Sequence, residues 1–173
     1  MRKFLIIALG ISCAGVLAVL PAPASASTTS TFQATFQSHF GAGVAPLPCE
    51  PHYMCTTGTV AGYGAATGKS RITSYTPIPD TDCFSFTTSA TITLTDGSGT
   101  LVLDTSGTRC QVGNSGEAPG SAVSYGNPWS ATGTFTITGG TGVFEGASGS
   151  GTFLSYFAGD VQIIELSGTI TLP

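Results

Sequence analysis

The sequence predicts an all-β protein, and more specifically an eight-stranded antiparallel β-barrel. Threonine alternates with apolar residues at period two in residues 91–95, 134–138 and 169–172, a pattern typical of half-buried strands. No segment after the first 26 residues has the 3.6-residue periodicity of an amphipathic helix. Turn-forming residues divide the rest of the chain into eight runs, which is enough strands to close a small barrel.

Each expected strand is a run that ends at Gly, Pro, Asp or Asn. The eight runs cover about residues 31–40, 56–62, 69–76, 84–95, 98–109, 129–138, 149–158 and 161–172. A sandwich of two sheets is the alternative arrangement of the same strands. Residues 41–51 and 112–128 are rich in loop-forming residues, and we expect them to border any binding mouth.

The first 26 residues have the organisation of a secretory signal peptide. Two basic residues precede an apolar run over residues 4–20, and residues 24–26 form an A-x-A cleavage site. The alternative is a lipid anchor at Cys13, but the residues before this cysteine are a poor match to a lipidation site. We expect an exported, extracellular protein that is cleaved before Ser27, with one barrel domain over residues 27–173.

Charge limits the partners of the remaining chain. It carries three basic residues, Lys69, Arg71 and Arg109, against nine acidic ones. An acidic surface disfavours nucleic acid and anionic membranes as partners. No later segment is long and apolar enough to span a bilayer. A domain of this length buries about 70% of its extended-chain surface, which is sufficient for one core.

Two turn signals, Asp96-Gly97 and Gly159-Asp160, predict the registers of two hairpins. In both hairpins the predicted register brings apolar residues opposite each other on one face, as a correct register requires. The predicted apolar pairs are Ile92 with Leu101, Ala90 with Leu103 and Phe153 with Leu166, and the polar Ser155 falls opposite Ile164 on the same face.

The first of these registers also sets Cys83 opposite Cys110 on the outer side of the fourth and fifth strands. We predict a disulfide between them that contributes about 3.5 kcal/mol, and a second disulfide between Cys49 and Cys55. Cysteines of exported chains are more often bridged than bound to metal, so we expect no metal site. The alternative is a zinc site with ligands drawn from His39, His52, Cys49 and Cys55.

The same register turns Arg109 toward the barrel interior near one end. A charged arginine at this position requires either a carboxylate partner or contact with water through an open end of the barrel. A purely structural ion pair is the alternative to a ligand-binding role. The candidate carboxylates are Glu145, Glu117 and Asp104, although the register turns Asp104 outward. If the barrel holds a pocket, we expect Arg109 to be its polar anchor, with Glu145 beside it and Tyr125 or Trp129 at the rim.

No catalytic or cofactor-binding motif is complete. Gly68-Lys69-Ser70 ends like a phosphate-binding loop, but the glycine required five positions earlier is Tyr63. There is no G-x-S-x-G nucleophile elbow and no dinucleotide-binding fingerprint. Asp80 and Asp82 lack a third carboxylate at calcium-ligand spacing, which favours turn capping. We therefore expect no cofactor.

Residues 139–149, the glycine corner, connect two predicted strands. Gly139-Gly140-Thr141-Gly142-Val143-Phe144, followed by Gly146-Ala147 and Gly149, resembles the G-G-T-G-x-F-x-x-A-x-G segment of dirigent proteins and allene oxide cyclase-like barrels. The resemblance implies an eight-stranded barrel, often trimeric, that binds a hydrophobic small molecule. It also implies that such a barrel steers coupling or cyclisation without a redox cofactor. The resemblance carries over no catalytic or substrate-binding residue.

Three classes of function remain open. The first, which we favour, is an exported, cofactor-free barrel that binds a small hydrophobic molecule without converting it. The second is a dirigent- or cyclase-like isomerase that steers coupling or cyclisation of a bound substrate. The third is a surface or structural protein, which a barrel filled solid with side chains would favour. An open cavity with Arg109 in its wall would count against the third class.

The outer face of the last hairpin predicts self-association. It presents the apolar residues Leu154, Tyr156, Val161 and Ile163, which a lone barrel would leave in water. Patches of this kind commonly mark contact sites, and the resemblance implies a trimer. Light scattering at high protein concentration should therefore detect an oligomer. A strict monomer would contradict the prediction, unless the N-terminal segment covers the patch.

Overall fold

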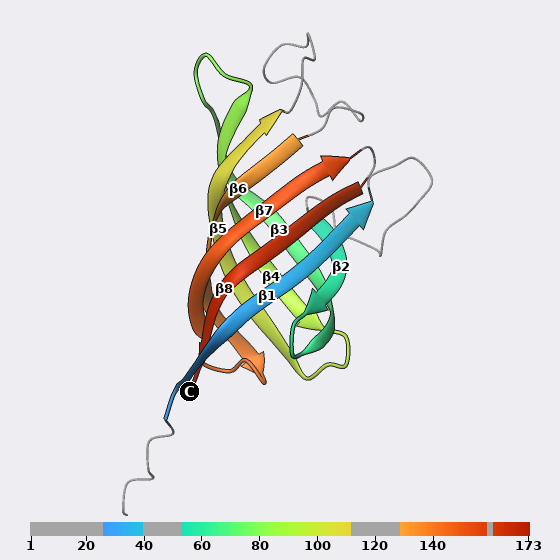
Figure 1. Cartoon of the computed structure of the whole chain (residues 1–173), viewed down its shortest axis with the longest axis vertical. Helices are drawn as coiled ribbons and strands as arrows, with labels where there is room; N and C mark the ends of the chain where they lie inside the picture. Colours follow the sequence, from blue (N-terminus) through green and yellow to red (C-terminus); the bar gives the residue numbers. More distant parts are fainter. Residues whose placement is uncertain (1–25, 40–52, 112–128, 159–160) are drawn as a thin grey trace, which may run out of the picture.

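The computed structural model describes residues 26–39, 53–111, 129–158 and 161–173, and this part of the chain is a closed antiparallel β-barrel without helices (Figure 1). The prediction of an eight-stranded barrel is confirmed, and the sandwich is excluded. The strands follow one another around the barrel in chain order: β1 (Thr28–His39), β2 (Met54–Val60), β3 (Gly64–Pro77), β4 (Cys83–Leu94), β5 (Gly99–Gln111), β6 (Trp129–Gly142), β7 (Ser148–Ala158) and β8 (Val161–Leu172).

Pairing between the first and last strands closes the barrel. The ladder runs from Thr28 opposite Leu172 to His39 opposite Val161, so it includes every residue of both strands. We call the end where β1 begins and β8 ends the lower end, and the end where β1 and β5 end the upper end (Figure 1). Closure removes the two sheet edges that would otherwise be open to pairing with other chains.

Both predicted hairpin registers are confirmed. β4 pairs with β5 so that Ile92 faces Leu101, and β7 pairs with β8 so that Phe153 faces Leu166. All four side chains are buried. A shift of one residue would turn these side chains to the outer surface, so burial of one face holds the register.

The turn between β4 and β5 has the geometry that its residues favour. Gly97 has a φ of 76°, in the left-handed region where glycine carries no steric penalty. The backbone N–H of Ser98 donates to Asp96 Oδ1 at 2.9 Å, and the Ser98 hydroxyl donates to the same oxygen at 2.7 Å. These hydrogen bonds lower the pKa of Asp96, the bond from the Ser98 side chain most strongly.

The predicted disulfide between Cys83 and Cys110 is confirmed. The two cysteines are opposite each other in the β4–β5 ladder, at outward positions next to the inward pair Phe84 and Arg109. They are separated by 27 residues, and the chain-entropy model gives such a bridge about 3.5 kcal/mol. Cys55 is also disulfide-bonded, but its predicted partner Cys49 lies outside the described residues. A disulfide is compatible with an extracellular protein.

Large apolar side chains fill the lower end of the barrel. Phe32 and Phe135 pack edge to face with their ring centroids 5.6 Å apart, and both are almost fully buried. The glycine corner lies below them, between β6 and β7. It turns Phe144 back into the barrel, where this side chain is fully buried and its ring centroid is 4.6 Å from that of Tyr63. Gly142, with a φ of 62°, permits this reversal.

Inward-facing glycines make room for the phenylalanine rings of neighbouring strands. Gly107 and Gly133 face each other on β5 and β6, and the ring of Phe153 covers both. In the same way, the ring of Phe135 covers Gly151. Alternation of very small and very large residues is how the interior of a small barrel is filled.

The strand boundaries differ from the prediction mainly where glycines lie within strands. β3 begins at Gly64 rather than near residue 69, and β6 continues to Gly142 rather than ending at residue 138. In β6 the glycines mark irregular pairing rather than the end of the strand, because the β5–β6 register shifts between Val102, which is opposite Gly139, and Leu103. The predicted loops at residues 41–51 and 112–128 lie outside the described residues.

Substitution of Gly133 by alanine should lower the free energy of unfolding by about 1–3 kcal/mol, which is the usual cost of overpacking. The added methyl group would lie 2.7 Å from Cε1 of Phe153 and 2.6 Å from Cα of Gly107, so the barrel wall must shift. Urea titration measures the change. Thr134→Ala, at the adjacent exposed position, is the matched control and should change stability far less. Equal stability of Gly133→Ala and the wild type would contradict this account of the packing.

Candidate functional site

The upper half of the barrel contains a cavity of about 580 Å³. Residues from all eight strands line it. The cavity exists because many inward-facing residues at this level are small, in contrast to the lower end. Among these small residues are Thr56, Gly68, Ser70, Thr88, Ala90, Thr105, Ala131 and Ser155.

Apolar side chains separate the cavity from the packed core. Phe36, Ile92, Leu103, Phe153 and Leu166 belong to the buried core cluster and also line the cavity. Above them, Phe86 and Ile164 continue the apolar wall. A ligand in the cavity would therefore rest on hydrocarbon and aromatic surface.

The wall of the described barrel is open beside the upper half of β3. Met54, the first residue of β2, pairs with Ser70, so residues 71–77 of β3 pair only with β4 within the described part of the chain. All of these residues are exposed. Ile72 and Tyr75, which are 52% and 47% exposed, line both this opening and the cavity.

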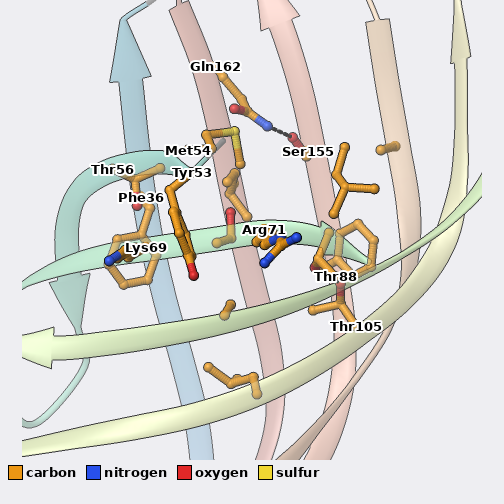
Figure 2. Close-up of a pocket in the computed structure, with 18 of the residues that line it drawn as sticks. Phe36, Tyr53, Met54, Thr56, Lys69, Arg71, Thr88, Thr105, Ser155 and Gln162 are labelled. Atoms are coloured by element: carbon orange, nitrogen blue, oxygen red, sulfur yellow. Dashed lines mark hydrogen bonds between the residues drawn. The ribbon is translucent and has the colours of Figure 1, made fainter. Parts of the chain in front are cut away.

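A buried chain of hydrogen bonds crosses one side of the cavity. Ser38 Oγ donates to Gln162 Oε1 at 3.2 Å. Gln162 Nε2 donates to Ser155 Oγ at 2.9 Å, the bond that Figure 2 shows as a dashed line. The three side chains are at most 5% exposed and come from β1, β8 and β7. The buried amide of Gln162 holds the hydroxyls of Ser38 and Ser155 in fixed positions. Two of the three residues, Ser155 and Gln162, line the cavity.

A second polar pair lies on β4 and β5. The hydroxyls of Thr88 and Thr105 are hydrogen-bonded to each other, and both residues line the cavity (Figure 2). The cavity thus has an apolar wall with a small number of fixed polar groups, which is the usual composition of a small-molecule site.

Arg109 extends from β5 into the upper part of this cavity. It is opposite Phe84 on β4, as the predicted register of this hairpin requires, and opposite Ala131 on β6. Its guanidinium carbon lies 4.6 Å from the centroid of the Trp129 ring, which is a cation–π contact. Burial lowers the pKa of Arg109, and the nearby phenol of Tyr75 partly offsets this effect. An arginine nevertheless stays protonated at neutral pH.

The structure brings two of the four predicted site residues together. Arg109 lines the cavity and Trp129 packs against its guanidinium. Glu145 does not lie beside Arg109. Glu145 is exposed in the turn after β6, whereas Arg109 is opposite Ala131, near the start of β6. Most of the length of β6, about 35 Å, separates the two residues. Tyr125 lies outside the described residues, as does Glu117. Asp104 faces outward, as the register predicts.

The sequence interpretation missed the buried polar chain. Gln162 lies on an inward position of β8, two residues before Ile164, whose inward direction the predicted hairpin register gives. A glutamine at such a position in an otherwise apolar face is the signal that could have identified it.

The other sequence motifs do not form a separate site in the described part of the chain. Gly68-Lys69-Ser70 lies within β3 and not in a loop before a helix, and the Lys69 ammonium lies 4.1 Å from the Tyr53 ring centroid. No three His, Cys, Asp or Glu side chains among the described residues are placed to hold a metal ion. Of the zinc ligands considered, Cys55 is in a disulfide, and His52, Cys49 and the His39 side chain are not described.

Comparison with known proteins gives no match: no protein-family model, no curated protein and no solved structure is similar to this chain. Within the described residues, no helix has the length and apolar character needed to cross a membrane. The similarity to dirigent proteins therefore stays a prediction from the glycine corner, and function has to be argued from the cavity.

Substitution of Gln162 by leucine should lower the free energy of unfolding by about 1–3 kcal/mol, because it leaves the buried hydroxyls of Ser38 and Ser155 without their amide partner. The triple variant Ser38→Ala, Ser155→Ala, Gln162→Leu removes all three polar groups and should recover most of this loss. Urea titration of both variants measures the difference. A triple variant less stable than the single variant would show that the network itself stabilises the barrel.

Proposed function

We propose that this chain is an exported, cofactor-free barrel that binds a small hydrophobic molecule in its upper cavity. The cavity itself carries the proposal. Its volume of about 580 Å³ lies within the range of 300–1,000 Å³ that is usual for small-molecule sites. A barrel filled solid by side chains would have favoured a structural role instead.

Export is supported by two independent features. The first 26 residues have the charged, apolar and A-x-A segments of a signal peptide. The barrel also contains the Cys83–Cys110 disulfide, and bonds of this kind persist in oxidising compartments.

The described lining favours binding over conversion of the ligand. Its polar groups are hydroxyls, one amide and cationic side chains, and the described part of the lining includes no histidine, cysteine or carboxylate. These last three groups are the commonest general acids, bases and nucleophiles at neutral pH. Hydroxyl and amide groups instead orient a bound molecule by hydrogen bonds.

A dirigent- or cyclase-like isomerase is the second candidate. The glycine corner favours it, since this segment resembles the corresponding one of those barrels and here closes the lower end of a barrel of the same strand number. Such an activity requires the protein to change the stereochemistry of the coupling of a phenoxy radical or the cyclisation of an unstable oxylipin. A binding protein changes neither.

Titration with phenylnaphthylamine, an uncharged fluorescent probe, tests the proposed function. We expect saturable binding that small phenolics displace. Ala90→Phe should weaken binding about tenfold or more, because Ala90 lines the cavity and the larger side chain occupies part of it. Ser89→Phe places the same side chain at the adjacent exposed position and should bind the probe as the wild type does. If Ala90→Phe binds the probe as tightly as the wild type does, the cavity is not the binding site and the proposal is overturned.

A further inference from the structure

The basic residues of the barrel are gathered at the cavity. All three that follow residue 26, Lys69, Arg71 and Arg109, are among the residues that line it. The acidic residues of the described chain lie elsewhere: Asp80, Asp82, Asp96, Asp104, Glu145 and Glu165 are absent from the lining. Among the described residues, the charged side chains that line the cavity are therefore all basic, although the chain as a whole has an excess of acidic residues.

Arg109 provides the positive charge inside the barrel. It projects inward from β5 at the level of Phe84 and Ala131, above the apolar surface formed by Leu103 and Phe153. Burial lowers the pKa of Arg109, which means that its surroundings are less polar than water. In such surroundings the attraction between a guanidinium and an anion is stronger than in solvent.

Lys69 and Arg71 lie at the edge of the cavity, where β3 loses its partner β2. Both occupy outward positions of β3, and Lys69 packs over the ring of Tyr53 (Figure 2). Positive charge along the rim of an opening attracts anions toward it and raises their rate of binding.

The part of the cavity below Arg109 is aromatic. Phe36, Phe86 and Phe153 line it from β1, β4 and β7, and the ring centroids of Phe86 and Phe153 are 6.0 Å apart with the rings tilted. An aromatic ligand can continue such a tilted arrangement, which contributes beyond the burial of apolar area.

We propose that the ligand is an amphiphilic organic anion, with an aromatic body against Phe36, Phe86 and Phe153 and a carboxylate or sulfonate group at Arg109. This inference rests on the proposed function and specifies its ligand. The guanidinium of Arg109 has the planar donor geometry that matches such acid groups. The cations at the rim, Lys69 and Arg71, attract the negatively charged group of such a ligand toward the cavity.

A matched pair of fluorescent probes tests the inference. Anilinonaphthalene sulfonate and phenylnaphthylamine share one ring system, and only the first carries a negative charge. We expect the wild type to bind the sulfonate more tightly than the neutral probe. The preference should decrease as salt is added, because salt screens the attraction between charges.

Variants at Arg109 assign the preference to this side chain. Arg109→Gln should weaken binding of the sulfonate about tenfold or more, the usual effect of losing a hydrogen bond to a charged group, and should leave binding of the neutral probe within about threefold of wild type. Arg109→Lys retains the charge and should keep most of the preference. Ser150→Glu changes the net charge by the same amount as Arg109→Gln but lies on the exposed outer face of β7, so it should preserve the preference.

Displacement of the sulfonate probe identifies the acid group. Naphthoate and naphthalene sulfonate should displace it at lower concentration than the uncharged naphthalenemethanol, and the better of the two anions indicates whether a carboxylate or a sulfonate is preferred. An equal effect of all three competitors would overturn the inference.

The two proposals fail in different ways. If the neutral probe binds saturably and as tightly as the sulfonate, or if Arg109→Gln leaves the ratio of the two affinities unchanged, the anion inference is wrong and the proposed function stands. If neither probe binds saturably to the wild type, the proposed function itself is wrong.

Discussion

Closure of the barrel is the constraint on which the rest of the structure depends. Once β1 pairs with β8 along its whole length, the interior volume is set by strand number and stagger, and inward side chains either fill it or leave space. At the lower end the inward residues are large, including Phe32, Leu101, Phe135 and Phe144. In the upper half many are glycine, alanine, serine or threonine. The cavity is thus a direct result of side-chain size along the strands.

The strands of the closed barrel are also linked to one another where the polar groups of the cavity lie. Arg109 and Phe84 form the ladder pair next to the Cys83–Cys110 disulfide, so a covalent link holds β4 and β5 together beside the guanidinium. On the opposite wall, the amide of Gln162 ties β8 to β1 and β7. Polar groups held on paired strands keep their positions better than groups on loops, and a binding site benefits from this order because less entropy is lost when the ligand binds.

The sequence was sufficient to predict the fold, two hairpin registers and one disulfide, because turn residues and the two-residue period of strands are local signals. It was also sufficient to predict that the Arg109 side chain faces the barrel interior. The predicted proximity of Glu145 failed because antiparallel strands alternate in direction: β5 ends at the upper end, whereas the turn after β6 lies at the lower end. The cavity was not predictable, since its volume depends on side chains that meet across the barrel from strands that are not neighbours.

The distribution of charge is difficult to explain by packing alone. Threonine pairs on the outer face, such as Thr29 with Thr171, satisfy one another by hydrogen bonds and give the barrel a polar surface with few charges. Basic residues are therefore not needed to make the exterior polar. A cation in a partly buried cavity also costs desolvation free energy, and the contact of Arg109 with the Trp129 ring offsets about 0.5–2 kcal/mol of it. A bound anion would add to this compensation, which gives the position of Arg109 a physical reason in a binding protein.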